Sequence, residues 1–361
     1  MTTESFDPNS EAEGDGPFGL PDELSNYKKA SIICIPVPFE VTTSSGGGTQ
    51  YGPRIIFAAC RQVALGDRLI QRAYEAGINF PSEDDQSQVE IFKLNQAGKN
   101  GVGLRKETKS EKLIKDYTDD VNLVCERLNQ IVYRNTRDVL LDGKIPAIIG
   151  GDHSVPLGAY RAAAERLGEF GIVHIDAHPD LLPDYQDYTS SHASVMRNAL
   201  DQNPEIIKLI SIGIRSYCDN ELEYAAAQGE RVSIIFDEDI TANGWNSMCS
   251  REISNKLPKQ IWLSFDIDGL ESSNCPNTGT LVPGGLTYNQ VILLMQRLVE
   301  HGHKIIGFDL VEVAPHPLCK PEDWERDTNA IVGANLLYRM ITFTLASQGK
   351  AYWVGRGPLD K

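Results

Sequence analysis

The sequence predicts an α/β fold in which a mainly parallel sheet is covered by helices on both faces. Short apolar runs alternate along the chain with longer segments of helical periodicity, the order expected of strand–helix–strand units. Most of these runs are apolar throughout, which indicates strands buried on both faces. A chain of 361 residues, 41% of them hydrophobic, is long enough to enclose such a sheet without covalent cross-links.

Seven strands and three helices are expected from these patterns. The strands are expected at residues 30–37, 147–149, 171–175, 206–214, 232–236, 260–265 and 304–311, and the helices at 112–133, 288–300 and 330–346. In the first helix Leu113, Tyr117 and Val121 begin a series of apolar residues that recur every three to four positions.

The chain shows neither a break in composition nor an internal repeat. Residues 27–361 are therefore expected to form a single domain. Residues 1–26 are rich in proline, glycine and acidic residues and are expected to form a mobile arm. The polar, lysine-rich segment 82–110 is expected to be a surface insertion.

Charge and cysteine content limit the partners and the compartment. The formal net charge of −16 repels phosphate backbones, so nucleic acid is not an expected partner, and cationic ligands are favoured. The chain has no run of about 18 apolar residues, and its first residues lack a signal-peptide pattern, so no membrane association is expected. Seven scattered cysteines without a CxxC pair indicate a reducing, cytoplasmic location.

Acidic and imidazole residues gather where four of the predicted strands end. Ligands of parallel sheets bind beyond the carboxyl ends of the strands. His153 follows the strand at 147–149, and Asp176, His178 and Asp180 follow the strand at 171–175. Asp266 and Asp268 follow the strand at 260–265, and Asp309 and Glu312 lie on and after the strand at 304–311.

The spacing of these residues favours a metal centre. Asp176, His178 and Asp180 lie two apart, so in an extended segment they share a face, and Asp266 and Asp268 repeat the pattern. Crowded carboxylates cannot all stay ionised without compensating charge, and two divalent cations supply it. Carboxylates with two imidazoles suit Mn²⁺, Co²⁺ or Ni²⁺. Each motif alone also fits a core histidine or solvated strand-end acids; their joint occurrence favours the metal centre.

Together the motifs resemble the signatures of the ureohydrolase family of arginases, agmatinases and guanidinobutyrases. They read GGDHS (150–154), HIDAHPD (174–180) and SFDIDGLESSNCPNTGTLVPGGLTY (264–288), accompanied by VEVAP (311–315) and GGGTQYGPRII (46–56). The DAHPD and YTSSHAS segments are most similar to plant-type arginases and agmatinase-like members. The resemblance covers residues 33–349. It implies a three-layer α/β/α sandwich around a central mainly parallel sheet, and a homotrimer or homohexamer.

The resemblance also implies two divalent metal ions per chain, with Mn²⁺ expected first and Ni²⁺ or Co²⁺ next. Asp176 and Asp266 would bridge the two ions. One ion would be bound by His153, Asp176, Asp180 and Asp266, and the other by His178, Asp176, Asp266 and Asp268.

The implied activity is hydrolysis of a C–N bond in a guanidino compound, with release of urea. A hydroxide activated by the two metals would attack the guanidinium carbon, and Asp180 would pass a proton to the departing amine. Glu312 would bind the guanidinium through paired hydrogen bonds. His192 resembles the family's mobile-loop histidine, which shuttles protons or contacts substrate, and Thr280 resembles a pocket threonine. His174 is expected either to orient a metal ligand or to be a plain core histidine.

Three departures from the family pattern leave the substrate open. The loop after Asp180 does not align with the residues by which arginases read an α-carboxylate. Glu271-Ser272 stands where the family has Asp-Pro, and segment 67–110 is longer and more polar than expected, as a lid or an interface would be.

The substrate is therefore expected to be of the agmatine, guanidinobutyrate or arginine type. The alternatives are free guanidine or a biguanide such as metformin. A further alternative is a non-catalytic partner subunit of a hetero-oligomeric ureohydrolase.

Overall fold

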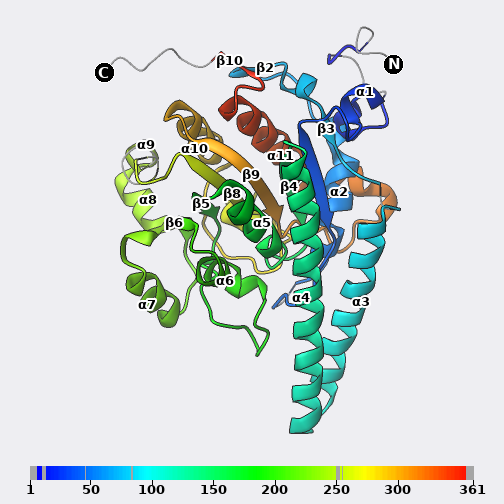
Figure 1. Ribbon diagram of the computed structural model, residues 1–361, viewed down its shortest axis with the longest axis vertical. Coiled ribbons are helices and arrows are strands. Elements are labelled where there is room, and N and C mark those ends of the chain that lie inside the picture. Colours follow the sequence, from blue (N-terminus) through cyan, green and yellow to red (C-terminus); the bar gives the residue numbers. More distant parts are fainter. Residues whose placement is uncertain are drawn as a thin grey trace.

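The centre of the molecule is an eight-stranded parallel sheet with the strand order β3-β1-β4-β9-β8-β5-β6-β7 (Figure 1). The computed structural model describes residues 6–9, 14–44, 46–82, 84–248, 253 and 255–354. The sheet contains β1 (Ile32–Val37), β3 (Ile78–Asn79), β4 (Ile145–Gly150), β5 (Phe170–Ile175), β6 (Ile206–Ile214), β7 (Val232–Phe236), β8 (Gln260–Asp266) and β9 (Lys304–Val311). A separate antiparallel pair joins β2 (Ile70–Gln71) to β10 (Tyr352–Trp353).

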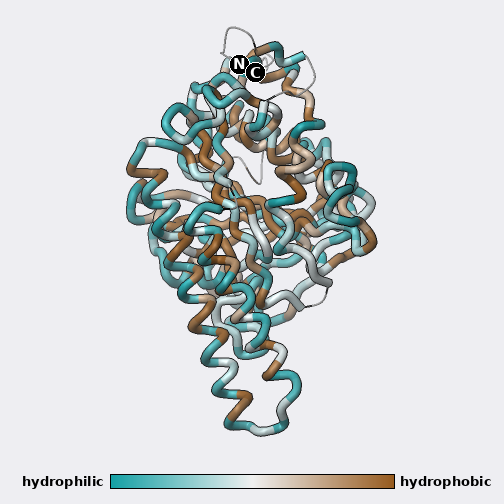
Figure 2. Tube along the Cα trace, turned by 90° about the vertical axis from the view of Figure 1, so that its right-hand side faces the viewer, coloured by the Kyte–Doolittle hydropathy of each residue, from teal (hydrophilic) through white to brown (hydrophobic). Residues whose placement is uncertain are grey.

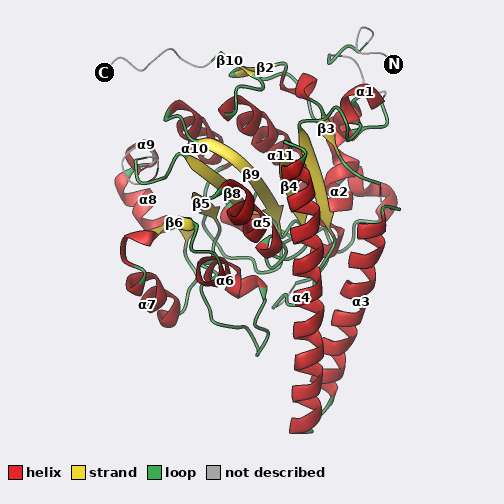
Figure 3. Cartoon of the chain, viewed as in Figure 1, coloured by secondary structure: helices red, strands yellow, loops and turns green. Residues whose placement is uncertain are grey.

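Helices cover both faces of the sheet, which makes the fold a three-layer α/β/α sandwich (Figure 3). The α-helices are α1 (Asp22–Ser25), α2 (Gly52–Ala59), α3 (Gln86–Glu107), α4 (Glu111–Leu141), α5 (Leu157–Leu167), α6 (Val195–Gln202), α7 (Asp219–Ala227), α8 (Asp237–Asn243), α9 (Trp245–Met248), α10 (Tyr288–Glu300) and α11 (Thr328–Ser347). Short 3₁₀ helices include η2 (Pro17–Gly19), η3 (Thr49–Tyr51), η4 (Cys60–Gln62), η5 (Ala73–Ala76), η6 (His192–Ser194), η7 (Gly229–Arg231), η9 (Ile267–Gly269) and η10 (Pro321–Arg326).

The apolar strands separate two hydrophobic cores, as their sequence predicts. One core lies between the sheet and α2, α10 and α11, and the other between the sheet and α4, α5 and α6. The predicted sandwich, the seven strands and the three helices are confirmed. The two-residue strands β2, β3 and β10 are additions that carry too few residues for a pattern to show.

Helix α11 and the cysteines bear on the expectations drawn from composition. By length and composition alone α11 could cross a membrane, but 67% of its apolar window is buried inside the fold. That burial is what a core helix of this sandwich requires. The six cysteines that the structure describes are free thiols, and Cys249 lies outside the described residues.

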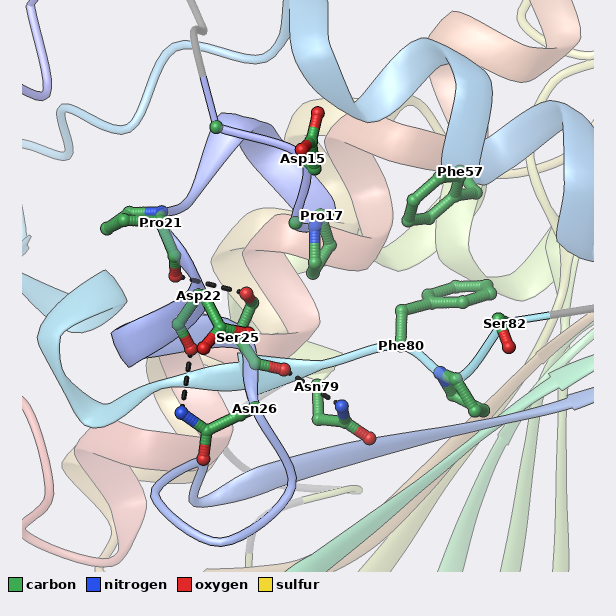
Figure 4. Close-up of a pocket in the computed structure, with 13 residues that line it drawn as sticks. Asp15, Pro17, Pro21, Asp22, Ser25, Asn26, Phe57, Asn79, Phe80 and Ser82 are labelled. Carbon is green, nitrogen blue, oxygen red and sulfur yellow. Dashed lines mark hydrogen bonds between the residues drawn. The ribbon is translucent and has the colours of Figure 1, made fainter. Parts of the chain in front are cut away.

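The N-terminal segment packs on the body over part of the range expected to be mobile. Phe18 and Leu20 are buried, and the Phe18 ring lies 5.0 Å from that of Tyr338 on α11. A cavity of about 580 Å³ lies beside this segment (Figure 4). Its walls include Pro17, Phe57 and Phe80, and none of the predicted site residues lines it.

Within segment 82–110, which is expected to be a surface insertion, residues Gln86–Glu107 form helix α3. Helices α3 and α4 make a hairpin whose end extends well beyond the body in two perpendicular views (Figures 1 and 2). Two glycines of α3 permit close packing. A Cβ on Gly98 would lie 2.6 Å from Val41 Cγ2, and one on Gly101 would lie 2.8 Å from Val121 Cγ2.

Candidate metal centre and active site

The predicted site residues meet at one edge of the sheet because their strands are neighbours. In the strand order, β4, β9, β8 and β5 stand side by side, although they are far apart in the sequence. His153 follows β4, Asp176 follows β5, Asp266 ends β8 and Glu312 follows β9. Parallel strands end at the same edge, so all four side chains reach one place.

The first group of ligands surrounds the His153 ring. Its Nδ1 atom lies 2.9 Å from Asp176 Oδ2, 3.1 Å from Asp180 Oδ2 and 3.3 Å from Asp266 Oδ2. All four side chains are buried. Within the described residues this nitrogen has no hydrogen-bond partner of acceptable geometry. Three carboxylates that converge on an unpartnered imidazole nitrogen form the donor set that a divalent ion requires.

The second group shares Asp176 with the first. His178 Nδ1 lies 3.4 Å from Asp176 Oδ1 and 3.3 Å from Asp268 Oδ2. Asp176 therefore turns one oxygen toward each histidine, which is the arrangement expected of a bridging carboxylate. Asp268 is further oriented by the Ala177 N–H, which donates to its Oδ1 atom at 3.0 Å.

Asp180 reaches the cluster from a left-handed backbone conformation. Its φ is 53°, a value that aspartate tolerates better than most residues. Its carbonyl oxygen accepts hydrogen bonds from the N–H groups of Met196 and Arg197 in the first turn of α6. The helix end thus fixes the turn that directs this carboxylate toward His153.

The burial and crowding of the carboxylates in the cluster favour added positive charge. Burial, with repulsion from Asp176, raises the pKa of Asp180 to about 6. Burial and the neighbouring carboxylates raise the pKa of Asp266 well above its usual value. Burial opposes the charge on His178, yet Asp176 and Asp268 raise its pKa to about 12. Divalent cations would satisfy the same demand, so these residues fit a metal pair.

A buried hydrogen-bond chain orients His153 from behind. Its Nε2 atom lies 3.0 Å from Ser264 Oγ, and Ser264 donates to Asp309 Oδ1 at 2.7 Å. Asp309 Oδ2 also accepts from Trp262 Nε1 at 2.7 Å and from Tyr160 OH at 3.0 Å. Because Ser264 donates its only hydroxyl proton to Asp309, its oxygen is left to accept the Nε2 proton of His153. The Nδ1 lone pair is then left facing the carboxylates.

His174 supports Asp176 in a similar way. Its Nε2 atom lies 2.9 Å from Asp176 Oδ2, and its Nδ1 atom lies 3.0 Å from Ser211 Oγ. Of the two expectations for this residue, the structure matches the one in which it orients a ligand.

Glu312 lies beside the cluster, and its two carboxylate oxygens have different surroundings. Its Oε1 atom accepts the His153 backbone N–H at 2.9 Å. Its Oε2 atom is buried and has no hydrogen-bond partner within the described residues. Gly279 faces that oxygen so closely that a Cβ there would lie 2.3 Å from it. Burial, with repulsion from Asp266, raises the pKa of Glu312 well above its usual value, as suits an acceptor awaiting a cation.

His192 begins the short helix η6 and lies against the loop after β1. Its N–H donates to Thr42 Oγ1 at 3.1 Å, and the Tyr185 ring lies edge-on at 5.0 Å. Burial, with repulsion from His178, lowers the pKa of His192 to about 4, so the ring is neutral at pH 7. Thr280 is half-buried, and its hydroxyl lies 2.7 Å from Ser44 Oγ.

Sequence reasoning missed several residues of this site. Thr43 and Thr278 each carry a buried hydroxyl without a partner among the described residues, and Thr43 Cγ2 is 3.2 Å from the Cβ position of Gly279. Ser264, a polar residue inside an apolar strand, carried a usable signal, and Asp309 was already noted among the strand-end acids. Thr43 offered no comparable signal.

The α/β/α fold and the buried cluster of histidines and aspartates together indicate an enzyme with a candidate metal site. The model of the arginase family matches residues 30–342, and the chain belongs to that family. It is accordingly an amidinohydrolase, an enzyme that hydrolyses C–N bonds in linear amidines.

Three relatives are 28% identical to this chain over the aligned residues. The N(1)-aminopropylagmatine ureohydrolase of Thermus thermophilus is 28% identical over 80% of this chain and 85% of its own length. The guanidinobutyrase of Pseudomonas aeruginosa is 28% identical over 84% and 83%, respectively. The mitochondrial agmatinase of Gallus gallus is 28% identical over 84% of this chain and 78% of its own length.

Solved structures show the same architecture. The agmatine ureohydrolase of Thermoplasma volcanium superposes with a TM-score of 0.66 at 26% identity, covering 91% of this chain and 94% of its own. The arginase of Medicago truncatula gives a TM-score of 0.63 at 20% identity, with 88% of each chain covered, and supports the fold alone.

Proposed function

We propose that this protein is a two-metal amidinohydrolase that cleaves a small cationic guanidino compound and releases urea. The observation that carries the proposal is the placement of Asp176, whose two oxygens face His153 and His178 separately. A buried carboxylate shared between two imidazoles, with three more acids around it, supports two adjacent cation sites.

The residues divide into two ligand sets that share Asp176 and Asp266. The first ion would be bound by His153, Asp176, Asp180 and Asp266, and the second by His178, Asp176, Asp266 and Asp268. When bound, the ions supply a water molecule acidified toward neutral pH. Mn²⁺ fits this mixture of carboxylate and imidazole best, with Ni²⁺ and Co²⁺ next.

Glu312 would bind the substrate guanidinium. Its Oε2 atom is an unpaired acceptor in a buried position, and a planar N–H donor group would satisfy it. Its Oε1 atom keeps a second lone pair beside the His153 N–H, so paired hydrogen bonds remain open to it. Thr280 would help to shape the same pocket.

Asp180 and His192 would handle protons. Asp180 lies within the cluster, 3.1 Å from His153 Nδ1, and is therefore placed to take a proton and pass it to the departing amine. His192 is neutral at pH 7 and can accept a proton or a hydrogen bond from the substrate.

The named relatives support a guanidinium carried on a linear chain as the substrate. Their names refer to N(1)-aminopropylagmatine, guanidinobutyrate and agmatine, each a guanidino group on an alkyl chain. We propose a substrate of this class, and a cytoplasmic homotrimer or homohexamer as the working form. Light scattering on the purified chain would test the assembly.

Urea release and metal content test the proposal together. The chain is loaded separately with Mn²⁺, Ni²⁺ and Co²⁺ and assayed on agmatine, guanidinobutyrate, N(1)-aminopropylagmatine, arginine, guanidine and metformin. We expect two ions per chain and urea from at least one of the first three compounds. Fewer than two ions under metal-replete conditions, or urea from none of those three, would contradict it.

A further inference from the structure

The α3–α4 hairpin (residues 86–141) contacts both loops that border the metal cluster. One is the β1 loop, of which residues 39–44 and 46–50 are described. The other is the His192 loop, residues 181–192. Most of the hairpin surface faces solvent, yet it places four polar side chains against these two loops, namely Asn95, Lys99, Arg105 and Asn122.

On the β1 loop the hairpin acts through Asn95 and Lys99. Asn95 is fully buried, accepts the Glu40 N–H at 2.8 Å and donates to Gln50 Oε1 at 2.6 Å. Lys99 Nζ donates to Glu40 Oε1 at 2.8 Å. The other oxygen of Glu40 accepts the N–H groups of Gly48 and Gln50, so the loop is folded around this carboxylate.

On the His192 loop the hairpin acts through Asn122 and Arg105. Asn122 accepts the Thr189 N–H at 3.0 Å and donates to the Asp187 carbonyl oxygen at 3.1 Å. Arg105 donates to Asp187 Oδ2 at 2.8 Å and stacks over the Tyr188 ring at 5.2 Å. Asp187 has a φ of 66°, a left-handed conformation that aspartate tolerates better than most residues, and it turns the loop at this contact.

The two loops meet at His192. Its N–H donates to Thr42 Oγ1 of the β1 loop, and Thr42 in turn donates its own N–H to Asp152 Oδ2 at 3.1 Å. Asp152 directly precedes His153 in the chain. A shift of either loop would therefore move His192 relative to the ligands of the cluster.

We propose that the α3–α4 hairpin holds the two loops in the arrangement that places His192 at the active site, with Asn122 as its main positioning residue. This inference rests on the proposed function, because it gives His192 a part in the reaction. Asn122 joins two backbone groups of the His192 loop and touches none of the metal ligands, so it acts through the loop alone.

The test compares Asn122→Ala with Asn100→Ala in the metal-loaded full chain. Asn100 is an exposed asparagine on the same hairpin and serves as the matched control. In Asn122→Ala we expect two bound ions, kcat lowered about 10- to 100-fold and KM little changed, because displacing a positioned group by about 1 Å has effects of that size. Hydrogen exchange at the Thr189 amide should quicken.

Asn122→Asp is a partial rescue, because its carboxylate still accepts the Thr189 N–H. It should restore slow exchange at that amide and part of kcat. Arg105→Gln, which removes the contact with Asp187, should give a smaller change in the same direction and serves if Asn122→Ala does not fold.

The inference is overturned if Asn122→Ala matches Asn100→Ala in both kcat and amide exchange, or if the loss of kcat follows a loss of metal. An inactive wild-type chain would instead count against the proposed function. Amide exchange in Asn122→Ala would still decide whether the hairpin holds the loop.

Discussion

Gly279→Ala should separate substrate binding from metal binding. The Cβ of alanine would lie 2.3 Å from Glu312 Oε2 and 3.1 Å from Glu312 Cδ. Gly279 does not have a left-handed backbone, so alanine suits its conformation, and the added methyl group meets only side-chain atoms. The fold can survive, but the carboxylate must move.

The size of the effect follows from that overlap. The distance of 2.3 Å must grow beyond 3.0 Å, which real Cβ contacts essentially never undercut. The backbone of Glu312 is fixed by its φ of 64° and by its N–H bond to the Gly151 carbonyl, so the side chain must rotate. A displacement approaching 1 Å at a substrate-positioning group costs about 10²-fold in kcat/KM, or about 2.7 kcal/mol.

The assay measures kcat/KM for urea release together with bound metal and thermal stability. Gly279→Ala should keep two ions and nearly wild-type stability, and should resemble Glu312→Gln in its kinetics. Gly103→Ala is the control, since a Cβ at that helical position meets nothing within 4 Å. If Gly279→Ala hydrolysed the best substrate as fast as Gly103→Ala does, the pocket would not lie at Glu312 Oε2, and the reasoning would be refuted.

Three further predictions concern the metal ions. Asp176→Ala should remove both ions and all activity, because its oxygens face both histidines; elemental analysis that still finds two ions would exclude a bridging role. Asp309→Asn should lower the affinity for the ion at His153 about 10- to 100-fold, because the new amide can donate to Ser264 and reverse the hydrogen bond between Ser264 and His153. Titration calorimetry measures this affinity, and an unchanged value would refute the role of the hydrogen-bond chain. Metal affinity should rise from about pH 5 to pH 7, because Asp180, with a pKa of about 6, must lose its proton to bind; a flat profile would contradict that pKa.

The sequence was sufficient for the sheet and for the gathering of ligands, and the reason is periodicity. Strands buried on both faces must be apolar throughout, so β5 and β8 are visible without any partner. The spacing of Asp176, His178 and Asp180 marked the cluster, but the extended segment expected there is a turn in which Asp180 has a φ of 53°. Both signals are local, and local signals survive in a single sequence.

The residues that the sequence did not predict act across long separations. The contact of Asn122 with the loop at Thr189 spans 67 positions, and nothing near Asn122 marks it. No helix was predicted over Gln86–Glu107, where Gly98 and Gly101 weaken helix propensity. Their value lies in the close approach to Val41 and Val121, which only the folded chain shows.

The register of the sheet explains how the candidate ligands are oriented. His174 pairs with Ser211 on one side and with Ser264 on the other, and Ser264 pairs with Asp309 on the next strand. These four polar residues form one row across β6, β5, β8 and β9. Residues two apart share a face of a strand, so His174 and Ser264 stand directly before the ligands Asp176 and Asp266.

Buried polar groups in the middle of a sheet are costly unless each finds a partner, and in this row each does. Two residues of the row also hydrogen-bond to the cluster: His174 contacts Asp176, and Ser264 contacts His153. A slip of any of these strands by one residue would send its polar side chain to the other face and break the row. The hydrogen bonds that orient the ligands therefore also fix the strand register, which ties the geometry of the metal centre to the stability of the sheet itself.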